Sequence, residues 1–111
     1  LQNPTIYTQI ISETMNIPEF LKILNETQKE EIEKTIHIEE QLKDRNIEYT
    51  HVLELLEKDS VGILKQNDNT FKLYYEDTDS KDMVIIISYR SEKLHLVTLF
   101  PHDIKRRVRH V

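Results

Sequence analysis

Apolar and polar positions follow two different patterns along the chain, and the pattern changes after Ser60. Before Ser60, apolar residues recur every three or four positions among charged ones, which is typical of helices with one buried face. After Ser60, short apolar or alternating stretches are separated by turn-forming clusters, which is typical of strands. This order predicts an α+β domain in which N-terminal helices pack on a four-stranded antiparallel sheet.

The first half of the chain contains four predicted helical segments, at residues 1–15, 17–25, 26–45 and 49–58. Pro18 favours a helix start, because a proline in the first turn loses no helical hydrogen bond. The third segment is highly charged and has only a sparse apolar stripe. Its β-branched residues around Thr35 permit a restart of the helix there, and Asn46 is suited to end it.

The second half contains four predicted strands, which begin at Val61, Phe71, Met83 and Leu94. The third of them, Met83 to Tyr89, is apolar on both faces and is therefore expected inside the sheet. We expect Pro101 to end the fourth strand and the basic residues after it to form a last helical turn. The whole chain is expected to be one domain, residues 1–111, with a helical extension at 1–34 and a core at 35–111.

Composition excludes several classes of site. The 111 residues include no Cys and one Gly, which excludes a disulfide framework, thiolate zinc sites, a cysteine nucleophile and glycine-dependent phosphate loops. The longest apolar run, Met83 to Ile87, is too short to span a membrane, and the first residues lack the features of a signal peptide. We therefore expect a cytoplasmic domain with no membrane partner. The five His residues lack the spacing of helical metal ligands, so we expect no metal site.

Charge is unevenly distributed within the formal net charge of −5. Residues 26–59 contain eleven acidic and five basic side chains, whereas residues 102–111 contain four basic side chains and one acidic. The acidic total disfavours non-specific binding to duplex nucleic acid, which depends on neutralising many phosphates. A small basic site for one RNA segment remains compatible with this distribution.

The most informative polar pattern lies between Ile36 and Ile47. His37, Gln41 and Arg45 are spaced four residues apart, so on one helix they form a polar ridge. A His exchanges protons near neutral pH, and an Arg holds a phosphate through paired hydrogen bonds. Together they meet the minimum for phosphodiester chemistry. By spacing alone, a solvated helix face with an ordinary His is the simpler interpretation.

The same stretch resembles a known family. A His, an Arg eight positions later, Ile47, a second helix and a four-stranded meander are together similar to the small RelE-like toxin domains of the barnase, EndoU, colicin and RelE-type ribonuclease superfold. The last strand, Leu94 to Phe100, also resembles this group, in which a Thr often lies near the site. The chain departs from the pattern at Gln41, where related helices often carry Arg. The resemblance covers residues 35–100 and makes 35–111 a toxin-like core.

This resemblance implies metal-independent and cofactor-free cleavage of RNA, in which the 2′-hydroxyl attacks the adjacent phosphate. It implies that His37 is the general base or acid and that Arg45 stabilises the charge that develops on the phosphate. It also implies that Thr98 contacts phosphate or ribose. A toxin of this type would have a cognate antitoxin or immunity protein, which would cover the surface around His37 and Arg45.

Side-chain chemistry, rather than resemblance, adds further candidates for RNA binding: Lys72, Arg90, His102, Lys105 and Arg106. Tyr74, Tyr75 and Tyr89 are suited to stacking on unpaired bases, although packing within the strands is the simpler role for at least two of them.

A second hypothesis comes from a different class: a non-catalytic protein-interaction module that docks through its acidic helices. Convergence of His37, Arg45 and Thr98 around one cleft would favour the nuclease. Dispersal of the three would favour the module.

Overall fold

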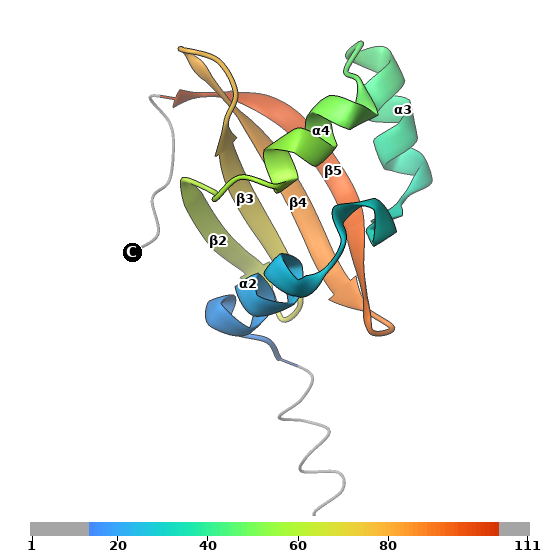
Figure 1. Ribbon diagram of the computed structural model, residues 1–111, viewed down its shortest axis with the longest axis vertical. Helices are drawn as coiled ribbons and strands as arrows, with labels where there is room; N and C mark the ends of the chain where they lie inside the picture. Colours follow the sequence, from blue (N-terminus) through green and yellow to red (C-terminus); the bar gives the residue numbers. More distant parts are fainter. Residues whose placement is uncertain (1–13, 105–111) are drawn as a thin grey trace, which may run out of the picture.

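In the computed structural model, which describes residues 14–104, two helices lie across one face of a twisted five-stranded sheet and a third lies beside its β5 edge (Figure 1). The helices are α2 (Ile17–Glu26), α3 (Ile36–Asp44) and α4 (Tyr49–Leu56), with a 3₁₀ turn, η1 (Lys29–Glu31). The strands are β1 (Glu33–Lys34), β2 (Gly62–Asn67), β3 (Thr70–Glu76), β4 (Lys81–Arg90) and β5 (Lys93–Asp103). The predicted α+β class is therefore confirmed.

Helix α2 begins where Pro18 predicted a start. The Asn16 side chain accepts a hydrogen bond from the Glu19 backbone N–H at 2.8 Å, and the Glu19 carboxylate accepts one from the Asn16 N–H at 3.0 Å. This reciprocal capping box satisfies backbone donors that the first helical turn leaves free. The buried face of the helix places the Phe20 ring on the Phe71 ring of β3, with centroids 4.2 Å apart.

The predicted helix over residues 26–45 is wrong in its first half. The chain instead forms η1 and the two-residue strand β1, and a helix begins only after Thr35, which caps α3 by accepting from the Ile38 N–H. Tertiary contacts outweigh helix propensity here. The Lys29 ammonium is buried and donates to the carbonyl oxygens of Leu24 and Thr27, both at 2.8 Å.

The antiparallel meander β2–β3–β4–β5 matches the four predicted strands, and β4 lies at the centre of the sheet, as expected. Two details differ. Strand β1 adds a fifth member that pairs parallel with β5, and β5 continues through Pro101 to Asp103 instead of ending there. Since β1 reaches only as far as Leu96, β5 has no strand on its outer side at Pro101, where a missing N–H costs no ladder bond.

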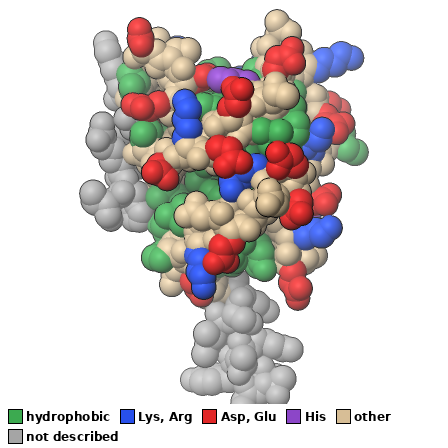
Figure 2. All heavy atoms as spheres, in the orientation of Figure 1, with side chains coloured by type: hydrophobic (Ala, Val, Ile, Leu, Met, Phe, Trp, Pro, Cys, Tyr) green, Lys and Arg blue, Asp and Glu red, His purple; other side chains and the backbone are tan. Residues whose placement is uncertain are grey.

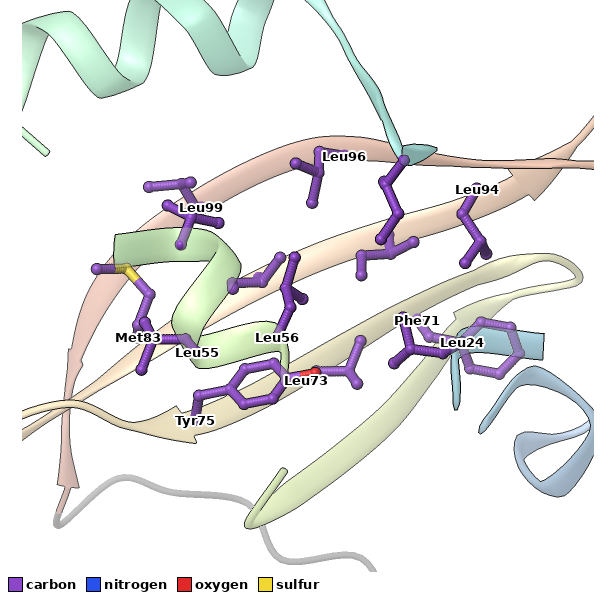
Figure 3. Packing of buried hydrophobic residues seen from close by; sticks show 14 of the residues in the cluster. Leu24, Leu55, Leu56, Phe71, Leu73, Tyr75, Met83, Leu94, Leu96 and Leu99 are labelled. Carbon is purple, nitrogen blue, oxygen red and sulfur yellow. The ribbon is translucent and has the colours of Figure 1, made fainter. Parts of the chain in front are cut away.

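The main hydrophobic core lies between the helices and one face of the sheet (Figure 3). A smaller cluster lies on the other face, which we name the distal face: Tyr74, Val84 and Ile86, with Val61, Val97 and Phe100 packed against them. No helix between residues 14 and 104 is long and apolar enough to cross a membrane. The helical turn predicted after Pro101 and most of the segment 1–15 lie outside the described residues.

Candidate functional site

The polar ridge of α3 meets β5 at its middle residue. The Gln41 carbonyl oxygen Oε1 accepts a hydrogen bond from the Thr98 hydroxyl at 2.7 Å and another from the Leu99 backbone N–H at 2.8 Å. At the N-cap of the helix, the Thr35 hydroxyl donates to the Leu96 carbonyl oxygen at 2.9 Å. Strand β1 ends here, and the side chains of Thr35 and Gln41 form the hydrogen bonds to β5 that a longer neighbouring strand would form. We call this contact the α3–β5 seam.

A β-bulge turns Thr98 toward the seam. Ile87 pairs with Leu96 but Ile86 pairs with Thr98, so Val97 is an extra residue in β5. Leu96 and Leu99 both point into the main core, and two residues rather than one separate them. Val97 packs on the distal face, whereas the Thr98 hydroxyl reaches α3. Bulges often redirect a side chain in this way.

His37 and Arg45 flank the seam without closing on it. Each is one helical turn from Gln41, about 6 Å along the helix axis, and both are exposed. Arg45 is the C-cap residue of α3. Among residues 14–104, neither side chain forms a hydrogen bond or an ion pair. The geometry therefore brings Thr98 to the centre of the ridge and leaves His37 and Arg45 open to solvent on either side.

The bonding of Thr98 limits what it can contact. Its hydroxyl has one hydrogen, which is donated to Gln41, so the oxygen is left as an acceptor. Phosphate oxygens accept hydrogen bonds, whereas a ribose hydroxyl can donate one. Of the two contacts implied by the resemblance, this geometry favours the ribose.

Two of the predicted RNA-binding residues meet on the distal face. The Lys72 ammonium lies 5.7 Å from the centre of the Tyr74 ring and 5.8 Å from that of Phe100. The His102 ring contacts the same Tyr74 ring edge-on, with centroids 5.6 Å apart. Lys72 also occupies the cross-strand row of Ile86 and Thr98. Lys72 is therefore two strands away from Thr98, about 10 Å across the sheet, and the Thr98 hydroxyl points instead to Gln41 of α3.

Arg90 is remote from that cluster. Its Nε donates to the Ser88 hydroxyl at 3.2 Å near the hairpin end of β4, about 20 Å along the strand from Val84, next to Tyr74. Lys105 and Arg106 lie outside the described residues. The predicted RNA-binding set is therefore only partly brought together.

The tyrosines serve mainly in packing. Tyr74 and Tyr75 are each about 1% exposed, which leaves their rings no room to stack on a base. Burial raises the pKa of the Tyr75 phenol far above its usual value, and the nearby Asp59 charge adds to the shift. Tyr89 is half-buried beside the main core. The packing role expected for at least two of the three is confirmed.

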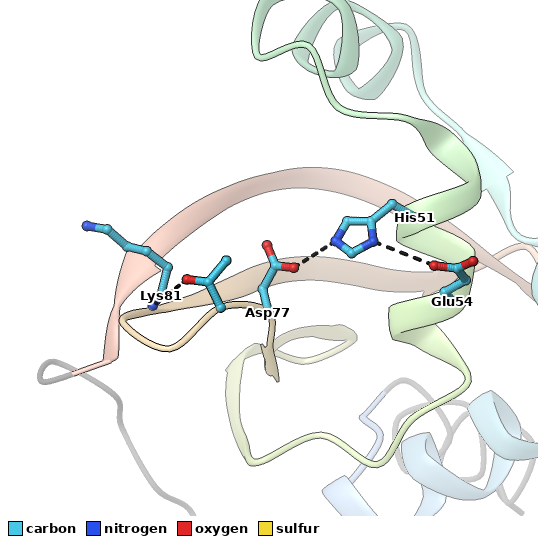
Figure 4. Close-up of polar contacts among 5 residues, drawn as sticks. His51, Glu54, Asp77 and Lys81 are labelled. Carbon is cyan, nitrogen blue, oxygen red and sulfur yellow. Dashed lines mark hydrogen bonds and ion pairs between the residues drawn. The ribbon is translucent and has the colours of Figure 1, made fainter.

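One polar cluster has no clear signal in the sequence. His51 of α4 lies with its Nε2 2.7 Å from the Asp77 Oδ1 and its Nδ1 3.7 Å from the Glu54 Oε1 (Figure 4). The contact ties α4 to the loop between β3 and β4. His51 and Glu54 share a helix face, but Asp77 is 26 residues away along the chain. Within residues 14–104, no group of three or more His, Asp and Glu side chains is arranged to hold a metal ion.

Comparison with known proteins gives one result. No curated protein and no solved structure matches the chain. A family model does match, over residues 18–87, which extend from α2 into β4 and include the whole of α3. Because this match covers more than half of the 111 residues, the chain belongs to the MJ0788 family.

Proposed function

We propose that the domain is a metal-independent ribonuclease whose site is the α3–β5 seam. The observation that supports this is the hydrogen bond between Gln41 and Thr98, which sets Thr98 midway between His37 and Arg45. Thr98, which the resemblance implied, thus lies beside the polar ridge of His37, Gln41 and Arg45, although it is 57 positions from Gln41 in the sequence. The proposed substrate is RNA, and the site of action is the cytoplasm.

The proposed reaction needs only this chain's side chains, the RNA and solvent water. His37, whose imidazole has no partner among the described residues, takes the proton from the ribose 2′-hydroxyl, and the oxygen attacks the adjacent phosphate. The bond between phosphorus and the 5′-oxygen breaks, the 5′-oxygen takes a proton from solvent water and leaves as a hydroxyl, and a 2′,3′-cyclic phosphate remains. Arg45 holds the phosphate oxygens through charge-assisted hydrogen bonds as negative charge develops. A phosphate above Gln41 is about one turn from both side chains.

Cleavage of total RNA by the purified chain, with a chelator present, tests this proposal. We expect discrete products from the wild type and a loss of about 10²-fold or more in rate for His37→Ala, the usual size of general acid–base effects. Arg45→Ala should lose activity as well. Two exposed residues of the same helix provide matched controls: Glu40→Ala for His37 and Lys43→Ala for Arg45, both with activity within about twofold of wild type.

Absence of cleavage on every RNA, with the chain folded, would refute the nuclease. Equal cleavage by His37→Ala and the wild type would keep a nuclease but refute this site. If the proposal holds, an antitoxin or immunity protein that inhibits the domain should protect the amides of α3 around His37 and Arg45 from hydrogen exchange.

A non-catalytic interaction module is the second candidate, and the position of the cavities favours it. Neither of two cavities among the described residues, of about 680 and 240 Å3, is lined by His37, Arg45 or Thr98. A folded chain that leaves all RNA intact but binds a protein with defined stoichiometry would support the module.

A further inference from the structure

The larger cavity is an open groove at the end of the sheet where β4 turns into β5. Its volume is about 680 Å3. Residues of α2, the η1–β1 segment, the first turn of α3 and the β4–β5 hairpin line it. Four apolar side chains contribute to the lining: Ile23, Ile32, Tyr89 and Leu94. Ile32 and Leu94 also belong to the main core, so the groove is the exposed edge of that core.

The polar lining of the groove is strongly acidic. Five glutamates line it, at positions 30, 31, 33, 39 and 92, against the two lysines Lys34 and Lys93. The lysines are already engaged: Lys93 lies 3.4 Å from Glu33, and Lys34 lies 3.8 Å from Glu39. Figure 2 shows how widely acidic side chains are spread over this helix-bearing side of the molecule.

Three of these carboxylates are left without a cation. Among residues 14–104, Glu30, Glu31 and Glu92 form no ion pair. The Glu30 charge is also felt by its neighbour: burial raises the pKa of the Tyr49 phenol, and Glu30 raises it further. Unpaired acids around an apolar lining attract a ligand that carries positive charge and apolar surface together.

The groove also has an edge strand. Strand β1, which contributes Glu33 and Lys34 to the lining, is the outermost strand of the sheet and pairs only with β5 among the described residues. Because β1 is only two residues long, its outer edge offers few backbone groups, so backbone hydrogen bonding would anchor one part of an extended segment rather than its whole length. Successive side chains of such a segment point to opposite sides, so apolar and basic residues that alternate can meet the apolar and acidic parts of the lining separately.

We propose that this groove binds an extended segment of a partner protein in which basic and apolar side chains alternate. Three features carry the proposal: the apolar lining, the unpaired glutamates and the edge strand β1. RNA does not fit, because its phosphates would face five carboxylates. The groove reaches the first turn of α3 but is lined by none of His37, Gln41 and Thr98, and the proposal does not rest on the proposed nuclease activity.

The test is a titration of the full chain with a synthetic nine-residue peptide in which Arg and Val alternate. Calorimetry measures the affinity, and amide NMR shifts identify the residues that the peptide contacts. We expect saturable binding, with the largest shifts in residues 30–34 and 89–94. A peptide with Glu in place of Arg should not bind. A peptide with Ser in place of Val should bind at least about tenfold more weakly, because it cannot cover the apolar lining.

Charge reversal in the groove gives the matched comparison. We expect Glu30→Lys combined with Glu92→Lys to weaken the Arg–Val peptide about tenfold or more. The control variant combines Glu40→Lys with Glu57→Lys, which reverses two exposed acids outside the groove and gives the same net charge. Its affinity for the peptide should stay within about twofold of the wild type. If the thermal midpoint shows that the groove variant is unfolded, Glu31→Gln combined with Glu92→Gln takes its place.

Five outcomes would overturn the proposal, and four of them concern the peptides. These are no binding of the Arg–Val peptide, equal binding of the Arg–Ser peptide, equal loss in the two charge-reversal variants, and shifts that map to the seam or the distal face. Larger groove shifts with a single-stranded RNA than with the peptide would also overturn it.

Discussion

At the residue scale, Gln41 connects the stability of the domain to its proposed site. Its Oε1 satisfies both the Thr98 hydroxyl and the Leu99 N–H in a partly buried setting. Gln41→Leu keeps the side-chain volume but leaves both donors without an acceptor. We expect a loss of about 1–3 kcal/mol in unfolding free energy, measured by urea denaturation.

Gln41→Glu is the matched comparison, because it keeps an acceptor in place. It should recover most of the stability that Gln41→Leu loses at neutral pH. If the two variants are equally destabilised, the oxygen of Gln41 does not hold the seam together.

A second residue-scale feature is the tight turn between β4 and β5. Ser91 and Glu92 have positive φ angles of 53° and 60°, a conformation that side chains with a Cβ disfavour. Glu92→Gly should therefore raise the unfolding free energy, by up to about 1 kcal/mol in urea denaturation, because the left-handed strain that it relieves exceeds the added chain entropy of glycine in the unfolded state. Lys93→Gly, one residue into β5, should lower it, because glycine weakens a strand. Destabilisation by Glu92→Gly would show that the glutamate side chain stabilises the hairpin.

At the element scale, α2 is part of the main core. The Phe20 ring is fully buried and stacks on Phe71 at 4.2 Å, in the same cluster as the sheet residues. Phe20→Ala should cost about 3–5 kcal/mol in unfolding free energy. Leu21→Ala, at a half-buried position on the same helix, should cost clearly less. A loss below about 1 kcal/mol for Phe20→Ala would mean that α2 docks only weakly and that residues 1–34 are an extension.

The elements that the sequence predicted well are those whose pattern is local. The cap and apolar face of α2 and the alternation in β3 are contained in a few neighbouring residues. Strand β1 has no such pattern, because two residues become a strand only by pairing with His95 and Leu96, some sixty positions away. The break before α3 likewise depends on the buried Lys29 ammonium and its two carbonyl partners.

The same reasoning applies to the candidate site. The spacing of His37, Gln41 and Arg45 predicted a ridge, and the structure has them on one helix and its C-cap. The spacing contained no information on which ridge residue would face β5. The ridge residue that contacts β5 is Gln41, the position at which the chain departs from the pattern of the RelE-like helices. A glutamine that caps an exposed strand edge is recognisable only once the bulge at Val97 is known.

At the scale of the whole molecule, acidic and basic groups have separate places. The helix-bearing side contains the glutamate-lined groove, whereas Lys72 and His102 lie on the distal face. A basic peptide would therefore be attracted to the groove rather than to the distal face. The proposed RNA site, the α3–β5 seam, shares the first turn of α3 with the groove, so the two ligands are titrated separately.

The stability of the whole molecule should also depend on pH through Tyr75. Burial and the Asp59 charge raise the pKa of this phenol in the folded state, whereas an unfolded tyrosine ionises near pH 10. Above about pH 10 the unfolded chain loses a proton that the folded chain keeps, so stability falls by about 1.4 kcal/mol per pH unit for this residue. Below pH 10 the Tyr75 phenol is protonated in both the folded and the unfolded chain, so this residue causes no loss of stability there.

Tyr75→Phe isolates this effect, because the variant has no phenol to ionise at position 75. Urea denaturation from pH 8 to pH 11.5 should give two profiles that run parallel up to about pH 10 and then converge or cross, as only the wild type loses the Tyr75 contribution. The Tyr49 phenol, whose pKa is also raised, acts equally in both proteins and cancels in the difference. Profiles that stay parallel to pH 11.5 would mean that the Tyr75 phenol reaches solvent while the chain is folded, and that this end of the core opens.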